Sequence, residues 1–169
     1  MERPVIDADG THKWYTNGNL HRTDGPAVTE ADGTHYWYVD GKCHRTDGPA
    51  VTEADGTQYW YVHGNLHRVD GPAIIRGNGD QEWFCHGERH RTGGPAYTHA
   101  DGTQEWYLDD LRHRANGPAI SWACGSQGWY LHGRDITADV NAWIVKHDLR
   151  DWTEWTVATW VFFRLRFGE

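Results

Sequence analysis

Residues 34–45 read Thr34-His35-Tyr36-Trp37-Tyr38-Val39-Asp40-Gly41-Lys42-Cys43-His44-Arg45. In this stretch an aromatic and β-branched run meets Asp40-Gly41 and is followed by a second short run, which is a strong local signal for a β-hairpin. If Asp40-Gly41 forms a two-residue loop, Tyr38 pairs with Cys43 and Val39 pairs with Lys42. The sequence therefore predicts a tight antiparallel hairpin.

The same hairpin recurs with a period of 23 residues. Six copies each carry a tryptophan at the same position: Trp14, Trp37, Trp60, Trp83, Trp106 and Trp129. His-Arg begins at positions 21, 44, 67, 90 and 113, and Gly-Pro-Ala begins at positions 25, 48, 71, 94 and 117. A fixed period of this length indicates stacked supersecondary units. The predicted fold class is an all-β repeat array, an elongated antiparallel β-meander with a short C-terminal α-helical cap, and the six tryptophans are expected to form its structural core.

A second turn in each copy also contains a glycine, as in Asp55-Gly56. Treated as a two-residue loop, it places Val51 opposite Trp60. The Asp40-Gly41 loop places Trp and His on one face and Tyr and Arg on the other. The Trp face is then the core. Between the turns, Asp47-Gly48-Pro49 is expected to break the ladder with a bulge or kink, because proline has no N–H and glycine accepts positive φ.

The repeat pattern ends after Gly133, which divides the chain into a hairpin array over 1–136 and an aromatic helical segment over 137–169. Thr137 is suited to capping a first helix, and Asp151 or Thr153 a second. Trp152, Trp155, Thr159, Phe162, Phe163 and Arg166 would give the second helix a broad aromatic surface. Repeat arrays need terminal caps, so the segment is expected to cover the last tryptophan. An interaction site is the alternative.

Charge and composition restrict the class of protein. The 169 residues carry 16 Lys+Arg against 24 Asp+Glu, a net charge of -8. No apolar run approaches the roughly 20 residues of a membrane span, and the first residues do not resemble a signal peptide. We therefore expect a cytoplasmic chain without membrane contact. Three cysteines without CxxC spacing predict neither disulfides nor a metal site, and no cofactor is expected.

The five His-Arg pairs do not indicate an enzyme. An active site is normally one asymmetric constellation, whereas these pairs are near-copies of each other. Histidines of successive copies would lie about 9.6 Å apart, too far to share one metal ion. We expect the His side chains to pack on Trp and the nearby Asp side chains to fix the turn backbone.

Rows of Tyr and Arg leave other binding functions open. Stacking rings and the arginines Arg68, Arg91 and Arg114 are suited to a nucleotide or another small molecule. The negative charge opposes nucleic-acid binding, but an acidic aromatic surface is suited to mimicking nucleic acid. Trp-Tyr rows also resemble the cell-wall-binding repeats of bacterial surface proteins, which implies carbohydrate or choline as ligand.

The frame from Gly41-Lys42-Cys43-His44 to Asp55-Gly56-Thr57 resembles MORN-type repeats over residues 7–136. His-Arg replaces the second His-Gly of that family, and Thr46-Asp47-Gly48-Pro49-Ala50 is foreign to it. WYxxGxxHRxDGPA arrays resemble uncharacterised repeat proteins of bacteriophages and large DNA viruses, some of them antitoxin-like. The resemblance implies a non-catalytic scaffold, acting in the host cytoplasm, that binds and inhibits a host defence or toxin protein.

Positions that differ between copies are candidates for recognition, with drift after duplication as the alternative. One row reads Lys13, Tyr36, Tyr59, Glu82, Glu105 and Gly128, and a second reads Glu30, Glu53, Arg76, His99 and Trp122. Copies four and five diverge most, so we expect Arg76, His99 and Trp122 to lie at the centre of a protein contact. The partner is expected to be a protein, with a homodimer as a further option.

Overall fold

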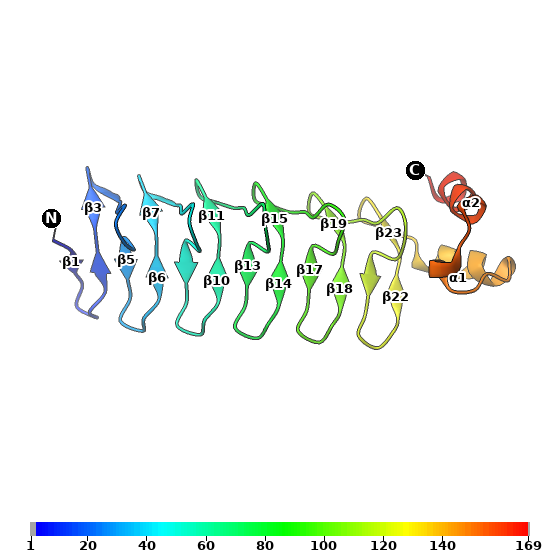
Figure 1. Ribbon diagram of the computed structural model, residues 1–169, viewed down its shortest axis with the longest axis horizontal. Helices are drawn as coiled ribbons and strands as arrows, with labels where there is room; N and C mark the ends of the chain where they lie inside the picture. The colour runs from blue at the N-terminus through cyan, green and yellow to red at the C-terminus, as the bar shows by residue number, and fades with distance from the viewer. Residues whose placement is uncertain (1–2, 169) are drawn as a thin grey trace. The chain divides into compact units, whose positions relative to one another are not determined.

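The computed structural model describes residues 3–168, and the chain divides into two compact units, Met1–Glu88 and Arg89–Glu169. Both units consist mainly of two-residue strands in antiparallel pairs, and the second unit ends in helices (Figure 1). The predicted fold class, an all-β array of hairpin repeats followed by a helical segment, is confirmed.

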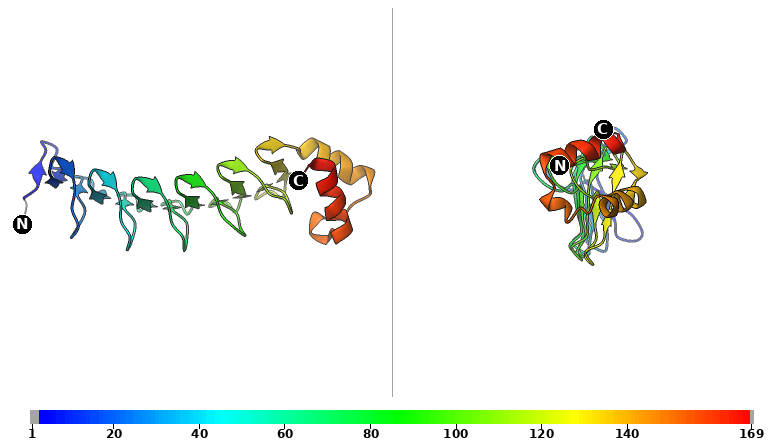
Figure 2. Two further views of the ribbon diagram at one scale, coloured as in Figure 1. Left: turned by 90° about the horizontal axis from the view of Figure 1, so that it is seen from above. Right: turned by 90° about the vertical axis from the view of Figure 1, so that its right-hand side faces the viewer.

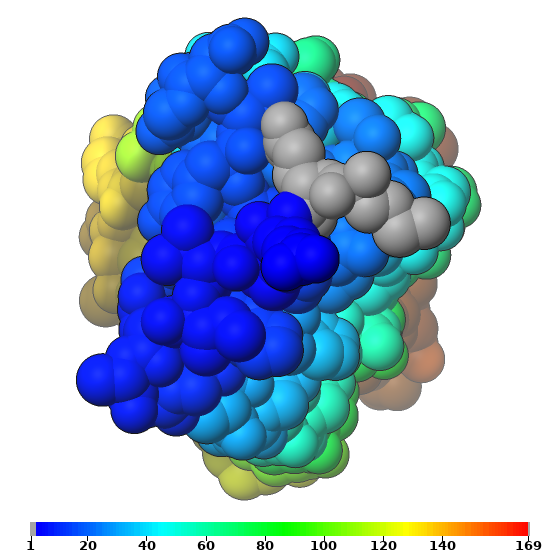
Figure 3. Space-filling model, turned by 90° about the vertical axis from the view of Figure 1, so that its left-hand side faces the viewer, coloured from blue at the N-terminus to red at the C-terminus, as the bar shows by residue number. Residues whose placement is uncertain are grey.

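Each copy contributes two strands to a sheet in which neighbours along the chain are neighbours in space. In the first unit these strands are, in order, β1 (Val5–Ile6), β2 (His12–Lys13), β5 (Val28–Thr29), β6 (His35–Tyr36), β9 (Val51–Thr52), β10 (Gln58–Tyr59), β13 (Ile74–Ile75) and β14 (Gln81–Glu82). In the second unit they are β17 (Tyr97–Thr98), β18 (Gln104–Glu105), β21 (Ile120–Ser121) and β22 (Gln127–Gly128). Figure 3 views the first unit from its N-terminal end, where β1 is the outermost strand and exposes Val5 and Ile6.

The remaining strands form the hairpins. In the first unit they are β3 (Tyr15–Thr16), β4 (Asn19–Leu20), β7 (Tyr38–Val39), β8 (Lys42–Cys43), β11 (Tyr61–Val62), β12 (Asn65–Leu66) and β15 (Phe84–Cys85). The units divide within β16 (Glu88–Arg89), and the second unit has β19 (Tyr107–Leu108), β20 (Leu111–Arg112), β23 (Tyr130–Leu131) and β24 (Arg134–Asp135). The hairpins of the first unit follow one another in sequence order (Figure 2, left).

The hairpin register is the predicted one. Tyr38 pairs with Cys43 and Val39 with Lys42. Asp40 and Gly41 have φ of 50° and 75°, as a two-residue type I′ turn requires. Trp37 lies between β6 and β7, where its N–H donates to the Ala50 carbonyl at 2.7 Å and its own carbonyl accepts from His44 N–H at 3.0 Å. The tryptophan thus marks the point at which the chain passes from the sheet to the hairpin.

The register of the second turn is one residue away from the prediction. Val51 pairs with Tyr59, not with Trp60. The loop has three residues, because Glu53 N–H donates to the Thr57 carbonyl at 2.9 Å and Gly56 takes a φ of 86°. A type I turn followed by a left-handed glycine produces such a loop. The predicted pairing of Val51 with Trp60 is therefore wrong. The predicted separation of Trp and Arg onto opposite faces is also wrong, because the Arg45 guanidinium lies 3.9 Å from the centre of the Trp37 ring.

The Gly-Pro-Ala segments interrupt the strands with a bend, as predicted at Asp47-Gly48-Pro49, but their glycines do not take a positive φ. Gly71 lies outside the positive-φ region, and a Cβ placed on it would lie 2.9 Å from Cζ of Arg68. The alanines of these segments are fully buried, each directly before a Val, Ile or Tyr of the sheet: Ala27, Ala50, Ala73, Ala96 and Ala119. Small side chains thus fill the interior of the copies.

In the second unit, the strands are followed by α1 (Thr137–Lys146), the 3-10 turn η1 (Trp152–Glu154) and α2 (Val157–Phe167). The first helix begins at Thr137, but its N-cap residue is Ile136 and no side chain forms a cap hydrogen bond, so the predicted capping by Thr137 is wrong. Asp151 caps η1, and Thr156 caps α2 by accepting from Thr159 N–H at 3.2 Å. A buried cluster joins the last strands to the helices: Trp129, Leu131, Ile136, Val140, Phe163 and Phe167.

Candidate functional site

Arginine side chains cover the tryptophans of the repeat copies. The guanidinium carbon lies 4.3 Å from the ring centre in Arg22–Trp14, 3.9 Å in Arg45–Trp37, 4.1 Å in Arg68–Trp60 and 3.9 Å in Arg114–Trp106. Trp14, Trp37, Trp60, Trp83 and Trp106 are half-buried, whereas Trp129 is 1% exposed. The tryptophans proposed as core therefore form a row that is covered mainly by cations.

The arginines predicted to contact a ligand have partners within their own copies. Arg68, Arg91 and Arg114 each donate through Nη1 to the carbonyl of the following proline, at 3.3, 3.1 and 3.2 Å. Arg68 also donates through Nε to Asp70 at 3.0 Å. Burial lowers the pKa of Arg114. These contacts give the three side chains a structural role.

The histidine of each His-Arg pair reaches the hairpin turn of the next copy. Nδ1 of His44 accepts the backbone N–H of His63 at 3.1 Å, and the two rings stack at 4.5 Å. In copy one, Nδ1 of His21 lies 2.9 Å from Oδ1 of Asp40. The histidines thus connect successive copies, in place of the predicted packing on Trp.

The two copy-specific rows face each other, six residues apart in the same copy. Lys13 pairs with Asp7 at 2.6 Å, Arg76 pairs with the buried Glu82, and His99 pairs with the buried Glu105 at 2.9 Å. The basic member stands in the first row in copy one, as Lys13, and in the second row in later copies, as Arg76 and His99. Each pair nevertheless joins a basic and an acidic side chain. Internal pairing therefore gives these copy-specific side chains a structural role within their own copies.

Glu105 is the most connected member of these rows. Its carboxylate accepts from Tyr107 Oη and from Arg112 Nε, both at 2.9 Å, in addition to its contact with His99. Burial alone would raise the pKa of Glu105, but the hydrogen bonds from His99, Tyr107 and Arg112 outweigh it, so the pKa is lowered. The ionised carboxylate is thus held in a polar network inside the second unit.

The remaining candidates differ in exposure. Tyr36 and Tyr59 are half-buried, with burial as the main cause of their raised pKa values. Trp122 is exposed and lies across Gly128, where a Cβ would come within 2.9 Å of its ring. Trp122 is therefore the most accessible member of the predicted contact set Arg76, His99 and Trp122, which stays a prediction.

An open hollow on the second unit combines arginine and tyrosine. It is lined by Arg89, Tyr107, Asp110, Leu111, Arg112, Tyr130 and Gly133. Arg89 lies 4.9 Å over the Tyr107 ring. Arg112 is bound to Glu105, and Tyr130 donates to Asp135 at 3.0 Å. Carboxylates therefore accompany the cations, which makes this hollow a poor site for a phosphate.

One face of α2 is apolar and exposed. It consists of Val157, Val161, Phe162 and Leu165, with exposed fractions of 82%, 48%, 65% and 78%. Residues 157, 161 and 165 follow at intervals of four and therefore share one side of the helix. Phe163 and Phe167 point the other way and are buried against Trp129. We call these four residues the apolar α2 face.

A shallow hollow adjoins this face. Its lining includes Trp143, His147, Leu149, Thr159 and Phe162, so Phe162 belongs to both features. The sequence places Phe162 and Phe163 together on one aromatic surface, whereas the structure separates them. The signal that was missed is the series Val157, Val161 and Leu165, which gives the second helix a second apolar side.

No protein-family model matches the chain, and no curated protein matches it either. Among residues 3–168, no helix combines the length and the apolar character that crossing a membrane requires.

Proposed function

We propose that this chain is a non-enzymatic protein-binding module and that the apolar α2 face is its binding surface. The observation that carries the proposal is the exposure of four large apolar side chains on one side of a helix whose other side is buried. Contiguous apolar patches of this kind are typical of interaction sites on soluble proteins.

The properties of the repeats support this choice. The arginines and histidines of the copies are held by tryptophans, prolines and neighbouring turns, and the copy-specific side chains are largely paired with each other. Committing these groups to a ligand would break internal contacts. The apolar α2 face can be covered without any such loss.

The chemistry of α2 indicates the kind of partner. Arg164 and Arg166 occupy the last turn of the helix, beside the apolar face. A protein groove that is apolar at its centre and acidic at its rim would complement both features. The resemblance to repeat proteins of phages and large DNA viruses makes a host defence or toxin protein, inhibited by this module, the partner that we propose.

Capture from host extract tests the proposal with a matched control. The binding variant is F162D/L165D. The control is V69D/V145D, which places the same charges on two exposed valines outside the face. We expect wild type and control to retain a shared protein, and the binding variant to lose it. With the purified partner, the binding variant should raise Kd by about a hundredfold or more.

Two results would contradict the proposal. In one, F162D/L165D retains the partner while R76A/H99A/W122A loses it without unfolding, which would locate binding in the copy-specific rows. In the other, calorimetry with a panel of nucleotides and oligosaccharides detects binding to wild type that F162D/L165D preserves. Circular dichroism of every variant separates a lost contact from a lost fold.

A further inference from the structure

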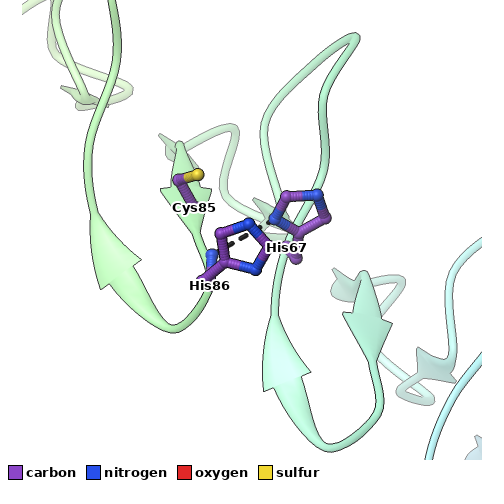
Figure 4. A group of neighbouring side chains, drawn as sticks. All are labelled: His67, Cys85 and His86. Carbon is purple, nitrogen blue, oxygen red and sulfur yellow. Dashed lines mark hydrogen bonds between the residues drawn. The ribbon is translucent and has the colours of Figure 1, made fainter.

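Three metal-ligating side chains meet in the first unit. His67 precedes Arg68 in copy three, Cys85 ends β15, and His86 follows it in the hairpin turn (Figure 4). One potential ligand atom from each residue lies within 4.8 Å of the other two. His86 N–H donates to His67 Nδ1 at 3.2 Å, and the two rings stack at 4.4 Å. The hydrogen bond between copies thus orients the His67 imidazole, and the His86 ring stacks on it.

The repeat supplies two internal comparisons. The same pair of stacked histidines occurs as His44–His63 at 4.5 Å and as His113–His132 at 4.3 Å. In those pairs the residue before the turn histidine is Val62 or Leu131. Thus, of the three pairs, His67–His86 alone has a thiol directly before the turn histidine.

We infer that His67, Cys85 and His86 form a binding site for Zn²⁺. Thiolate sulfur and imidazole nitrogen are the ligands that Zn²⁺ takes most often in proteins. Three protein ligands leave the fourth tetrahedral position to water, so the site is of the open kind. On binding, the Cys85 thiol gives its proton to solvent and its sulfur forms the bond to the metal.

Small side-chain movements are enough to close the site. Ligand atoms of a tetrahedral Zn²⁺ lie about 3.5 Å apart, given bond lengths near 2.0–2.3 Å. Cys85 and His86 are exposed, so their side chains can rotate to shorten separations that are already below 4.8 Å. Nδ1 of His67 accepts the His86 backbone N–H, so His67 can bind the metal through Nε2 and keep that hydrogen bond, or through Nδ1 by exchanging it for a metal bond. With three protein ligands, we expect the site to be weaker than a closed four-ligand site.

The other cysteines are less suited to the metal. Burial raises the pKa of the Cys43 thiol to about 12, which disfavours the thiolate. The Cys124 thiol is exposed and donates to Ser126 Oγ at 3.4 Å. Cys124 therefore serves as the matched control for a surface thiol outside the site.

Zn²⁺ titration by calorimetry and Co²⁺ titration by absorption, on the untagged full chain, test the site. Wild type and C124S should bind one metal ion and show a thiolate-to-cobalt charge-transfer band. C85V introduces the valine that stands at the equivalent position 62. It should lose the charge-transfer band and weaken Zn²⁺ binding by about tenfold or more. V62C should create a second site between His44 and His63 and raise the stoichiometry to two.

Three results would overturn the inference: C85V that binds as tightly as wild type, C124S that loses the band, or V62C without a second site. Because Val62 and Cys85 occupy equivalent positions, C85V and V62C are expected to fold, and circular dichroism verifies this. Partner capture through the apolar α2 face is independent of the metal, so the two proposals fail separately.

Discussion

Trp60 in copy three and Trp129 in copy six occupy the same repeat position but are covered in different ways. The guanidinium of Arg68 lies 4.1 Å over the Trp60 ring, which remains half-buried. Trp129 stacks on Trp155 at 5.6 Å and contacts Phe163 at 5.5 Å, and it is 1% exposed. The burial of the repeated tryptophan thus depends on what covers it: an arginine in copy three and the helical segment in copy six.

The sequence of the last copy departs from the repeat where the covering arginine would stand. Thr137 stands at the repeat position that Arg114 occupies in copy five. Its hydroxyl accepts the N–H of Trp129 at 2.9 Å and leaves the ring to the aromatic side chains of the helical segment. The last copy thereby exchanges a cation for an apolar cover, and the outer side of that cover is the apolar α2 face.

Removal of the two rings should give the largest difference between the regions. Trp129→Ala leaves a cavity in a buried aromatic cluster and should lower the free energy of unfolding by about 3–5 kcal/mol. Trp60→Ala removes a half-exposed ring and its cation contact and should cost about 1–3 kcal/mol. Urea denaturation of both variants measures the difference. Equal losses would show that the two covers are energetically equivalent.

The Glu105 network should have the next largest effect. Glu105→Gln keeps the shape but loses charge-assisted hydrogen bonds to His99 and Arg112, at a cost of about 1.5–3 kcal/mol at neutral pH. The pKa of Glu105 is lowered in the folded chain. Its contribution is therefore present above the ordinary glutamate pKa and is lost as the pH falls through the lowered value. Denaturation curves at several acidic pH values should show wild type converging on the variant, and a difference that is constant down to low pH would contradict this.

A third prediction concerns the cation cover of the repeats. Gly71→Ala should push the Arg68 guanidinium off Trp60 and lower the free energy of unfolding by about 1 kcal/mol. In an Arg68→Ala background the same change should have almost no effect, because the group that it displaces is gone. A double-mutant cycle measures this coupling, and an unchanged effect in the Arg68→Ala background would exclude the proposed contact.

The apolar α2 face should give the smallest change in stability. F162D/L165D alters exposed positions and should leave the free energy of unfolding within about 0.5 kcal/mol of wild type. The neighbouring Phe163→Ala should cost about 3–5 kcal/mol, because Phe163 is 1% exposed. Thermal and urea unfolding of the two variants check the contrast, and comparable losses would mean that the face is part of the core.

Local chemistry explains which features were predictable. The Asp40-Gly41 turn sets its own register, so the hairpin followed from sequence. Asp55-Gly56 looks the same in sequence, but its loop has three residues, and Val51 therefore pairs with Tyr59 and not with Trp60. Opposite charges six residues apart, as in Arg76 and Glu82, indicate internal pairing. Their variation between copies instead suggested contact with a partner.

The helical segment was less predictable for a different reason. Both sides of α2 carry large apolar residues, so its sequence alone does not say whether Phe162 or Phe163 meets the core. The position of Trp129 decides this, and it depends on the packing of the last copy against both helices. The His67–Cys85–His86 group was missed because its ligands come from two copies and follow no short motif.

Site-specific photo-crosslinking tests the central claim most directly. A photoreactive phenylalanine analogue is placed at position 162, on the apolar α2 face, or at position 122, where Trp122 is the most accessible residue of the copy-specific rows. Each form is irradiated in host extract. The account predicts a discrete crosslinked protein from position 162 and none from position 122. A discrete product from position 122 alone would contradict the claim that the repeats are scaffold and the α2 face is the binding surface.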